Sequence, residues 1–81
     1  MNLELYYFET CPFCQRVLRQ IDELGLKNKI ILKDVHASQE ARDFHYQTTG
    51  RSTVPCLYID GKPLFESSDI CEWLIENQAN L

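Results

Sequence analysis

The stretch LELYYFETCPFCQRVL, residues 3–18, decides the fold, because it joins an apolar run to a helical pattern through two cysteines. Leu3 to Phe8 is rich in apolar and aromatic residues and partly alternates, which predicts a β-strand. Pro12 suits the first turn of a helix, where its missing N–H would have no partner anyway. Cys11 and Cys14 therefore lie where a strand ends and a helix begins.

The rest of the chain predicts two more helices and three more strands. Apolar residues recur at helical spacing after Cys14 as far as Leu24, and Gly25 suits the left-handed position that ends a helix. Asp60-Gly61 is typical of a tight turn between antiparallel strands. The further predicted elements are a strand over 29–35, a helix capped by Ser38 and ended by Gly50 with Ala41, Phe44 and His45 on its apolar face, strands over 54–59 and 62–65, and a last helix capped by Ser67 or Ser68 with Ile70, Trp73 and Leu74 on its apolar face.

The predicted order, β-α-β-α-β-β-α, is the order that the thioredoxin fold requires. The first two strands, joined by a helix, are expected to be parallel with a right-handed crossover, and the last two to form an antiparallel hairpin. We therefore expect an α/β protein with a four-stranded mixed sheet. No repeat, low-complexity segment or linker interrupts the pattern, so residues 1–81 are expected to form one domain.

The composition narrows the class of protein. With 44% hydrophobic and 25% charged residues, the 81-residue chain has the balance of an ordinary globular domain. Its formal net charge of −4 argues against general binding to nucleic acids or anionic membranes. No apolar run approaches the roughly 20 residues that a membrane span needs, and no secretory signal is visible. The four cysteines could form a disulfide framework, but one catalytic pair in the reducing cytoplasm fits better.

The spacing of Cys11 and Cys14 indicates thiol–disulfide exchange. A helix N-terminus carries partial positive charge and free N–H groups, which stabilise a thiolate. We expect Cys11, just outside the helix, to be the more exposed nucleophile, and Cys14, at the start of the buried stripe, to be the resolving thiol. The alternative, a zinc site, needs two more ligands. Neither Cys56 with Cys71 nor the two histidines have ligand spacing, so we expect no metal.

Thr53-Val54-Pro55 is the second motif. A proline that opens a strand cannot donate a hydrogen bond to the sheet there. We predict a cis Val54–Pro55 bond, which would turn the Val54 backbone toward the cysteines so that its N–H and C=O can pair with an extended peptide. The alternative is an ordinary edge-strand proline with no binding role.

With both motifs, the chain resembles a glutaredoxin over nearly its whole length. The resemblance is carried by Cys11-Pro12-Phe13-Cys14, Gly50-Arg51-Ser52-Thr53-Val54-Pro55, Asp60-Gly61 and Ser67-Ser68-Asp69. It implies the thioredoxin fold and glutathione-dependent reduction of disulfides, especially of mixed disulfides between proteins and glutathione. The implied partners are glutathione and disulfide-bearing or glutathionylated proteins, and we expect a monomer.

The resemblance also implies a glutathione site. Thr53 and Val54 match the segment that pairs with the cysteinyl part of glutathione, and Ser68 and Asp69 match positions that hold its γ-glutamyl end. The run from Val54 to Ile70 is similar to the N-terminal domain of glutathione transferases, whose Glu-Ser pair holds the same γ-glutamyl group. The implied glutathione-binding residues are Phe13, Gln47, Arg51, Thr53, Val54, Pro55, Glu66, Ser67, Ser68 and Asp69.

Two positions depart from the glutaredoxin pattern. Many glutaredoxins have a lysine at the position of Phe8, where it helps to bind glutathione, and many have Gly-Gly where this chain has Phe65-Glu66. Two alternative functions remain beside disulfide reduction: a carrier that holds an iron–sulfur cluster through glutathione, and a transferase-like domain that conjugates glutathione to electrophiles. Pro12 makes the first alternative less fitting, and the second has no need of a Cys-X-X-Cys pair.

The remaining cysteines and histidines fit structural roles better than catalytic ones. We expect Cys56 to be a small buried hydrophobic residue on a strand and Cys71 to pack in the core. His36 and His45 are expected to be structural or exposed. Arg16 is expected on the solvated face of the first helix.

Overall fold

The computed structural model describes residues 1–81 and has the element order that the sequence predicts. Two short 3-10 helices, Lys27–Lys29 and Gln78–Asn80, are added to it. None of the helices is long and apolar enough to cross a membrane. The strands and α-helices are β1 (Leu3–Tyr7), α1 (Pro12–Glu23), β2 (Ile31–Asp34), α2 (Gln39–Thr49), β3 (Cys56–Ile59), β4 (Lys62–Phe65) and α3 (Ser67–Asn77).

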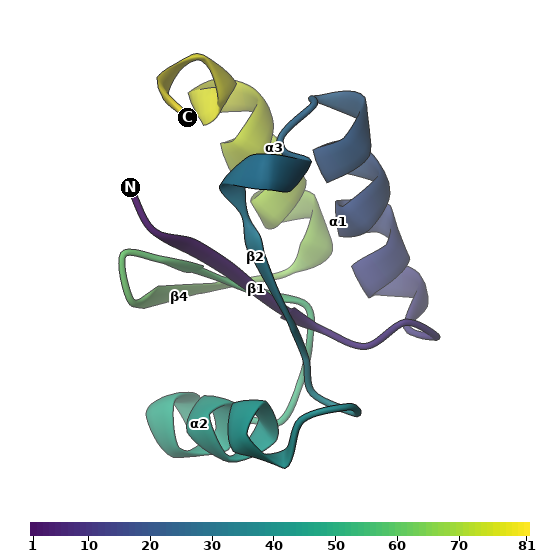
Figure 1. Ribbon diagram of the computed structural model, residues 1–81, viewed down its shortest axis with the longest axis vertical. Helices are drawn as coiled ribbons and strands as arrows, with labels where there is room; N and C mark the ends of the chain where they lie inside the picture. The colour runs from purple at the N-terminus through teal and green to yellow at the C-terminus, as the bar shows by residue number, and fades with distance from the viewer.

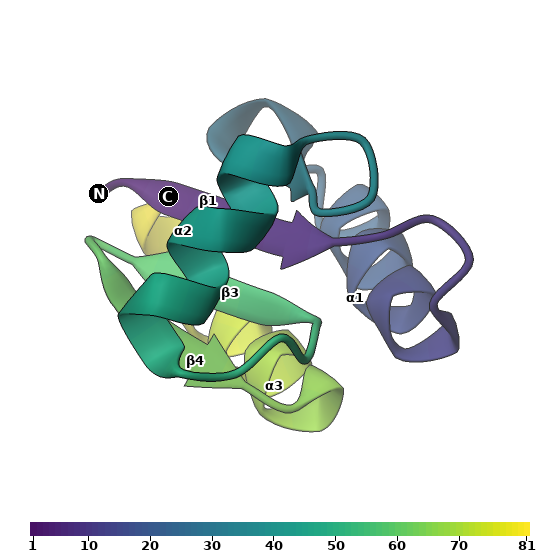
Figure 2. The same ribbon diagram turned by 90° about the horizontal axis from the view of Figure 1, so that it is seen from below.

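The four strands form one mixed sheet in the order β2-β1-β3-β4. β1 and β2 are parallel, with Leu5 opposite Leu32, and the other two pairings are antiparallel. α1 and α3 cover one face of the sheet and α2 covers the other (Figure 1 and Figure 2). This is the arrangement of the thioredoxin fold, so the predicted fold class is confirmed.

Both faces of the sheet carry apolar residues because both are covered by helices. Successive side chains of a strand point to opposite faces. Leu3, Leu5 and Leu57 belong to the larger core cluster, with residues of α1 and α3, whereas Tyr6 and Tyr58 belong to a smaller cluster with Ala41 of α2. This burial on two sides explains why the sequence of β1 alternates only in part.

The helix α2 has the caps that the sequence predicts. The Ser38 Oγ accepts a hydrogen bond from the Ala41 N–H at 3.1 Å, and Gly50 ends the helix at a φ of 71°. His45 is buried on its inner side, but Phe44 is 46% exposed although its ring stacks on Tyr6. The prediction that Phe44 belongs to the buried face is therefore only partly right. Its ring lies against Tyr6 and Tyr58 but keeps nearly half of its surface exposed.

Several strands are shorter than predicted. β1 stops at Tyr7, one residue early, and β2 begins only at Ile31 because Lys27–Lys29 form a 3-10 helix. β3 begins at Cys56 rather than Val54. In each case the apolar run continues past the point where the backbone leaves the sheet, so composition overstates the length of the strand.

The start of α3 differs from the prediction in its cap. The expectation that Ser67 or Ser68 caps this helix is wrong, because both lie inside its first turn. Glu66 occupies the N-cap position with a φ of 73°, and its side chain makes no capping hydrogen bond. The chain enters α3 through a left-handed backbone conformation that side chains rarely adopt.

Candidate functional site

Cys11 stands at the N-cap of α1, directly after the turn that follows β1. Its backbone is extended, and its Sγ accepts a hydrogen bond from the Cys14 N–H at 3.3 Å. The Cys11 N–H donates to the Phe8 carbonyl at 3.3 Å, which ties the N-cap to the end of the strand. An N–H group directed at sulfur from a helix N-terminus stabilises the negative charge of a thiolate.

Cys14 is more deeply buried than its partner. It is 0% exposed and Cys11 is 6% exposed, so the predicted order of exposure holds, although Cys11 is less open than we expected. Burial, followed by the hydrogen bond with Cys11, raises the pKa of the Cys14 thiol to about 12. Cys14 therefore stays protonated at neutral pH, while its backbone N–H is directed at the sulfur of Cys11.

A cavity of about 360 Å³ gathers most of the residues predicted to bind glutathione. Its walls come from three separate parts of the chain: the first turns of α1, the segment that leads to β3, and the junction of β4 with α3. The Val54–Pro55 peptide bond in one wall is cis, as predicted. The predicted residues that line this cavity are Phe13, Arg51, Thr53, Val54, Pro55, Glu66, Ser67 and Ser68.

Two of the predicted residues lie outside this cavity. Gln47 is exposed on α2 and lines a different cavity with Arg42, Tyr46 and Ser52. Asp69 is exposed in the first turn of α3 but does not form part of the wall. Sequence spacing could not make this distinction, because the side on which a helical residue lies depends on how its helix docks against the sheet.

Two residues of the cavity, Arg16 and Phe65, are absent from the predicted set. Arg16 is exposed, as expected, but it also lines the cavity, one helical turn after Phe13. That spacing of three residues on one helix could have identified it. The guanidinium carbon of Arg51 lies 3.9 Å from the centroid of the Phe65 ring, a cation–π contact that orients the charge of Arg51.

The cavity combines charges of both signs. Arg16 and Arg51 bring guanidinium groups that suit a carboxylate, and Glu66 brings a carboxylate that suits an ammonium group. The N-terminus of α3 adds backbone N–H groups that favour an anion. Such a set can hold a small peptide with charged ends in one orientation. No group of three or more His, Cys, Asp or Glu side chains in the structure could hold a metal ion.

Phe8 takes no part in this cavity. Its ring stacks on that of His36, with 4.0 Å between the centroids and 10° between the planes. It is partly buried against the smaller core cluster under α2. Phe8 is thus a packing residue, and the cations of the cavity come from α1 and from the segment before β3 instead.

The other two cysteines are buried. Cys56 is 0% exposed on β3, and Cys71 is 6% exposed in the larger core cluster, so both predictions of packing are confirmed. Burial raises the pKa of the Cys56 thiol to about 11 and also raises the pKa of Cys71. Neither residue lines the cavity of about 360 Å³ that gathers the predicted glutathione-binding residues.

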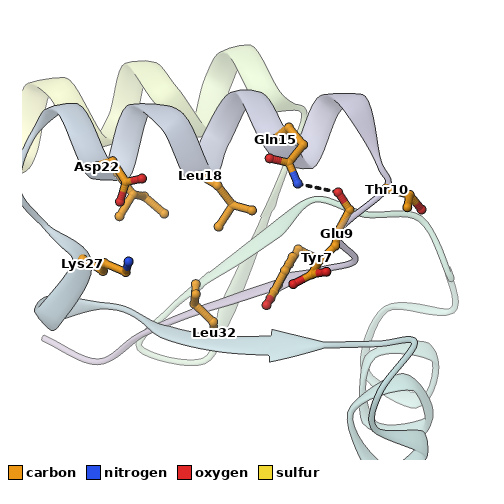
Figure 3. Close-up of a pocket in the computed structure, with 9 residues that line it drawn as sticks. Tyr7, Glu9, Thr10, Gln15, Leu18, Asp22, Lys27 and Leu32 are labelled. Atoms are coloured by element: carbon orange, nitrogen blue, oxygen red, sulfur yellow. Dashed lines mark hydrogen bonds between the residues drawn. The ribbon is translucent and has the colours of Figure 1, made fainter.

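A larger cavity, of about 540 Å³, lies between α1 and β2. Leu18 and Leu32 point toward it from opposite sides (Figure 3). At one end the Gln15 side chain donates a hydrogen bond to the Glu9 carbonyl (Figure 3). Cys11 lines neither cavity. None of the residues predicted to bind glutathione lines the larger cavity, whereas eight of them line the smaller one, so we place the candidate site at the smaller cavity.

Comparisons with known proteins relate the chain to two groups. Residues 5–80 match the family described as the glutathione S-transferase N-terminal domain. Glutaredoxin 3 of Escherichia coli (strain K12) is 30% identical over 69 residues, which are 85% of this chain and 81% of that protein. Glutaredoxin-C4, chloroplastic, of Oryza sativa subsp. japonica is 42% identical over 53 residues, which are 64% of this chain and 40% of that protein.

The fold also relates the chain to glutathione transferases. The Leishmania protein TDR1, a trimeric glutathione transferase, matches with a TM-score of 0.75 and 32% identity over 95% of this chain and 17% of its own. The chain therefore spans less than half of the rice protein and less than a fifth of the Leishmania one. Its sequence and fold show that the chain belongs to the glutaredoxin family and has features of the glutathione S-transferase N-terminal domain.

Proposed function

We propose that this chain is a glutathione-dependent dithiol–disulfide oxidoreductase that reduces protein–glutathione mixed disulfides and protein disulfides. One observation carries the proposal: the sulfur of Cys11 accepts the Cys14 N–H at the N-terminus of α1. Membership of the glutaredoxin family supports a redox role of this kind. The raised pKa of Cys14 supports the division of labour, because a protonated Cys14 leaves Cys11 as the attacking sulfur.

The reaction on a glutathionylated protein takes two exchange steps. The Cys11 thiolate attacks the glutathione sulfur, so that a bond between Cys11 and glutathione forms while the mixed disulfide breaks. The protein leaves as a thiolate and takes up a proton. The thiolate of a second glutathione then attacks the sulfur of the glutathione bound to Cys11. The bond to Cys11 breaks, the Cys11 thiolate is released and glutathione disulfide forms. Glutaredoxin potentials, at about −200 to −230 mV, lie near that of the glutathione pool and allow both directions.

A protein disulfide requires the second cysteine. Attack by Cys11 gives a mixed disulfide with the substrate, and Cys14 then loses its proton and attacks Cys11. The substrate leaves fully reduced, and a bond between Cys11 and Cys14 remains. Two glutathione molecules reduce that bond and become glutathione disulfide. Because both routes consume reduced glutathione, we propose that the chain acts in a reducing compartment such as the cytoplasm. We also propose that it acts as a monomer.

The residues of the cavity divide the recognition of glutathione among them. We assign the glycine carboxylate to Arg51, helped by Arg16, because both guanidinium groups line the cavity. The ammonium of the γ-glutamyl end suits Glu66, and its carboxylate suits the backbone N–H groups of Ser67 and Ser68 at the start of α3. The backbone of Val54 is left for the cysteinyl part, as a strand-like pairing.

The proposal is tested by a coupled assay with glutathione, its reductase and a small mixed disulfide. Cys11→Ser should reduce the rate to background. Cys14→Ser should keep reduction of the mixed disulfide but lose reduction of a protein disulfide, since external glutathione can still resolve Cys11. Cys71→Ala, in the core and away from the cavity, is the control for loss of a thiol. Substantial activity in Cys11→Ser, or equal loss of both activities in Cys14→Ser, contradicts the proposal.

One observation favours a second candidate, the conjugation of glutathione to electrophiles. The chain matches the glutathione S-transferase N-terminal domain over residues 5–80, and Glu66 and Ser67 lie together in the cavity. An assay with glutathione and a generic aryl halide distinguishes the two functions. Conjugation that survives Cys11→Ser, combined with no reduction of mixed disulfides by the unaltered chain, would replace the first proposal by the second.

A further inference from the structure

We infer that His45 is a positioning residue, whose imidazole holds the Thr53 carbonyl and with it the Val54 backbone in the wall of the cavity. The inference rests on the proposed function and adds a residue to it. His45 lies on α2, on the opposite face of the sheet from α1, and is 1% exposed (Figure 1). Its Nε2 lies 2.8 Å from the Thr53 carbonyl oxygen, and its Nδ1 lies 2.7 Å from the Tyr58 hydroxyl oxygen.

The partners of His45 fix which ring nitrogen carries the proton. The Thr53 carbonyl can only accept a hydrogen bond, so Nε2 must donate to it. In the neutral ring Nδ1 is then an acceptor, and the Tyr58 hydroxyl donates to it. Burial is the main cause that raises the pKa of Tyr58, which keeps this hydroxyl protonated and able to donate. The chain of donors therefore runs in one direction, from Tyr58 through His45 to Thr53.

The segment that receives this bond has few other fixed points. Residues 52–55 lie between α2 and β3, outside any helix or strand, and take part in no backbone–backbone hydrogen bond. The bond from His45 to Thr53 is the hydrogen bond that ties these residues to the rest of the fold. Removal of the donor would therefore leave the Thr53 backbone free to shift and would loosen the backbone of Val54. The Val54 side chain would still pack against the smaller core cluster, and Pro55 would stay buried at the start of β3.

Aromatic neighbours hold the imidazole itself in place. The ring of Tyr6 stacks on it, with 5.5 Å between the centroids and 24° between the planes. The centroid of the Phe65 ring lies 5.8 Å from that of the imidazole, and the guanidinium of Arg51 lies over the face of the same Phe65 ring. His45 thus contacts two walls of the cavity from behind, one through a hydrogen bond and one through a ring, without lining the cavity itself.

The test compares two replacements of His45. His45→Met keeps an apolar side chain of similar size but removes the donor, whereas His45→Gln can still donate from its amide nitrogen to Thr53. Because one hydrogen bond contributes about 0.5–1.5 kcal/mol, we expect His45→Met to weaken binding of S-methylglutathione by roughly threefold to tenfold. The KM for a glutathionylated peptide should rise by a similar factor with kcat within about twofold, and His45→Gln should recover most of the loss.

A purely structural role for His45 would give a different pattern. Both variants would then lose affinity for S-methylglutathione in proportion to their fall in melting temperature, and that outcome overturns the inference. The inference is also overturned if His45→Met binds S-methylglutathione within twofold of the unaltered chain. If His45→Met does not fold, Tyr58→Phe replaces it. That variant keeps the aromatic ring but removes the hydrogen bond that orients the imidazole through Nδ1, so the ring holds Thr53 less firmly and affinity should fall. Unchanged affinity for S-methylglutathione would then also overturn the inference.

The binding measurement separates this inference from the proposed function. S-methylglutathione has no free thiol and reports on the cavity without any redox step. If the unaltered chain fails to reduce mixed disulfides while His45→Met still loses affinity, the proposed function fails and the positioning role stands. If reduction proceeds normally and His45→Met binds as well as the unaltered chain, the positioning role alone is wrong.

Discussion

Cys11 and Cys14 carry the same chemical group in different surroundings. The sulfur of Cys11 accepts a hydrogen bond from the Cys14 N–H in the first turn of α1, whereas the sulfur of Cys14 is fully buried. Burial raises the pKa of Cys14 to about 12, so this thiol stays protonated at neutral pH. In the proposed reaction it attacks only after Cys11 has formed a mixed disulfide with the substrate. Cys11 therefore attacks the substrate first in this reaction, and Cys14, about one helical turn further along, resolves the product.

The positions of Arg16 and Arg19 on α1 allow a matched test of charge in the cavity. Both side chains are exposed, but Arg16 lines the cavity and Arg19 does not. We expect Arg16→Gln to raise the KM for glutathione by about threefold to tenfold, because a charge-assisted contact to a carboxylate is lost. Arg19→Gln should leave the KM within about twofold.

The salt dependence gives a second reading of the same pair. Because the contact is exposed, added salt should raise the KM of the unaltered chain and of Arg19→Gln more steeply than that of Arg16→Gln. Equal KM values for the two variants at low salt would mean that the guanidinium of Arg16 does not meet the ligand.

The start of α3 shows how an element can carry strain at a binding site. Glu66 has a φ of 73°, a backbone conformation in which a side chain is strained and glycine is not. Many glutaredoxins have glycine in this part of the sequence, whereas this chain places a carboxylate in the cavity wall. Residues kept in rare backbone conformations often belong to functional sites. We therefore interpret the strain as the cost of placing the Glu66 carboxylate in the cavity.

Replacing Glu66 by glycine should separate stability from binding. Glu66→Gly relieves the strained conformation, so we expect the free energy of unfolding to rise by about 1 kcal/mol. The same change removes the carboxylate, so the KM for glutathione should rise by several-fold. Glu66→Gln is the control, since it keeps the strained backbone and removes only the charge. If Glu66→Gly binds glutathione as well as the unaltered chain, the γ-glutamyl end is held elsewhere.

At the scale of the whole molecule, the two covered faces of the sheet enclose most of the thiol groups. Cys14, Cys56 and Cys71 are buried, and burial is the main cause that raises the pKa of each. Each of these thiols is therefore neutral in the folded chain at a pH where it would ionise in the unfolded chain. The unfolded chain gives up its protons first as the pH rises, so these thiols lower stability at alkaline pH.

We expect the free energy of unfolding to fall between about pH 9 and pH 12. An ordinary thiol ionises near 9.0, whereas the pKa of Cys56 is about 11 and that of Cys14 about 12 in the folded chain. The stability that these groups contribute is complete below pH 9 and is lost as the pH rises through that range. Urea unfolding followed by circular dichroism from pH 7 to pH 10.5 measures the slope.

Cys56→Ala isolates the contribution of one thiol to this slope. Residue 56 is inaccessible on β3 and lies outside the reacting pair, so its removal should make the fall in stability with pH shallower. Groups distant from residue 56 titrate in both proteins and cancel in the comparison. The Cys56 charge also contributes to the raised pKa of Tyr58 and Tyr6, so the difference between the two proteins includes that coupling. An identical slope in Cys56→Ala and in the unaltered chain would show that this thiol ionises equally easily in both states.

Much of this molecule follows from local sequence. The order of elements, the parallel β1–β2 pair, the antiparallel β3–β4 hairpin, the cap at Ser38 and the end of α2 at Gly50 were all predicted, because periodicity and turn chemistry act within a few residues. The position of Cys11 at a helix end follows in the same way from Pro12 and the strand before it. Composition was less reliable for the ends of strands, since apolar residues continue where the backbone has already left the sheet.

Other features were decided only by the tertiary structure. The docking of α2 leaves Gln47 outside the cavity and turns His45 toward Thr53, although both residues lie on one helix and the sequence favoured the first for the site. Packing of β4 against the segment before β3 brings Phe65 under Arg51. These contacts join residues that are distant in the chain, and they depend on the angle and depth at which each element packs. Sequence alone therefore determined the fold and the placement of Cys11 and Cys14 at the start of α1, whereas the packing of the elements determined which side chains line the cavity.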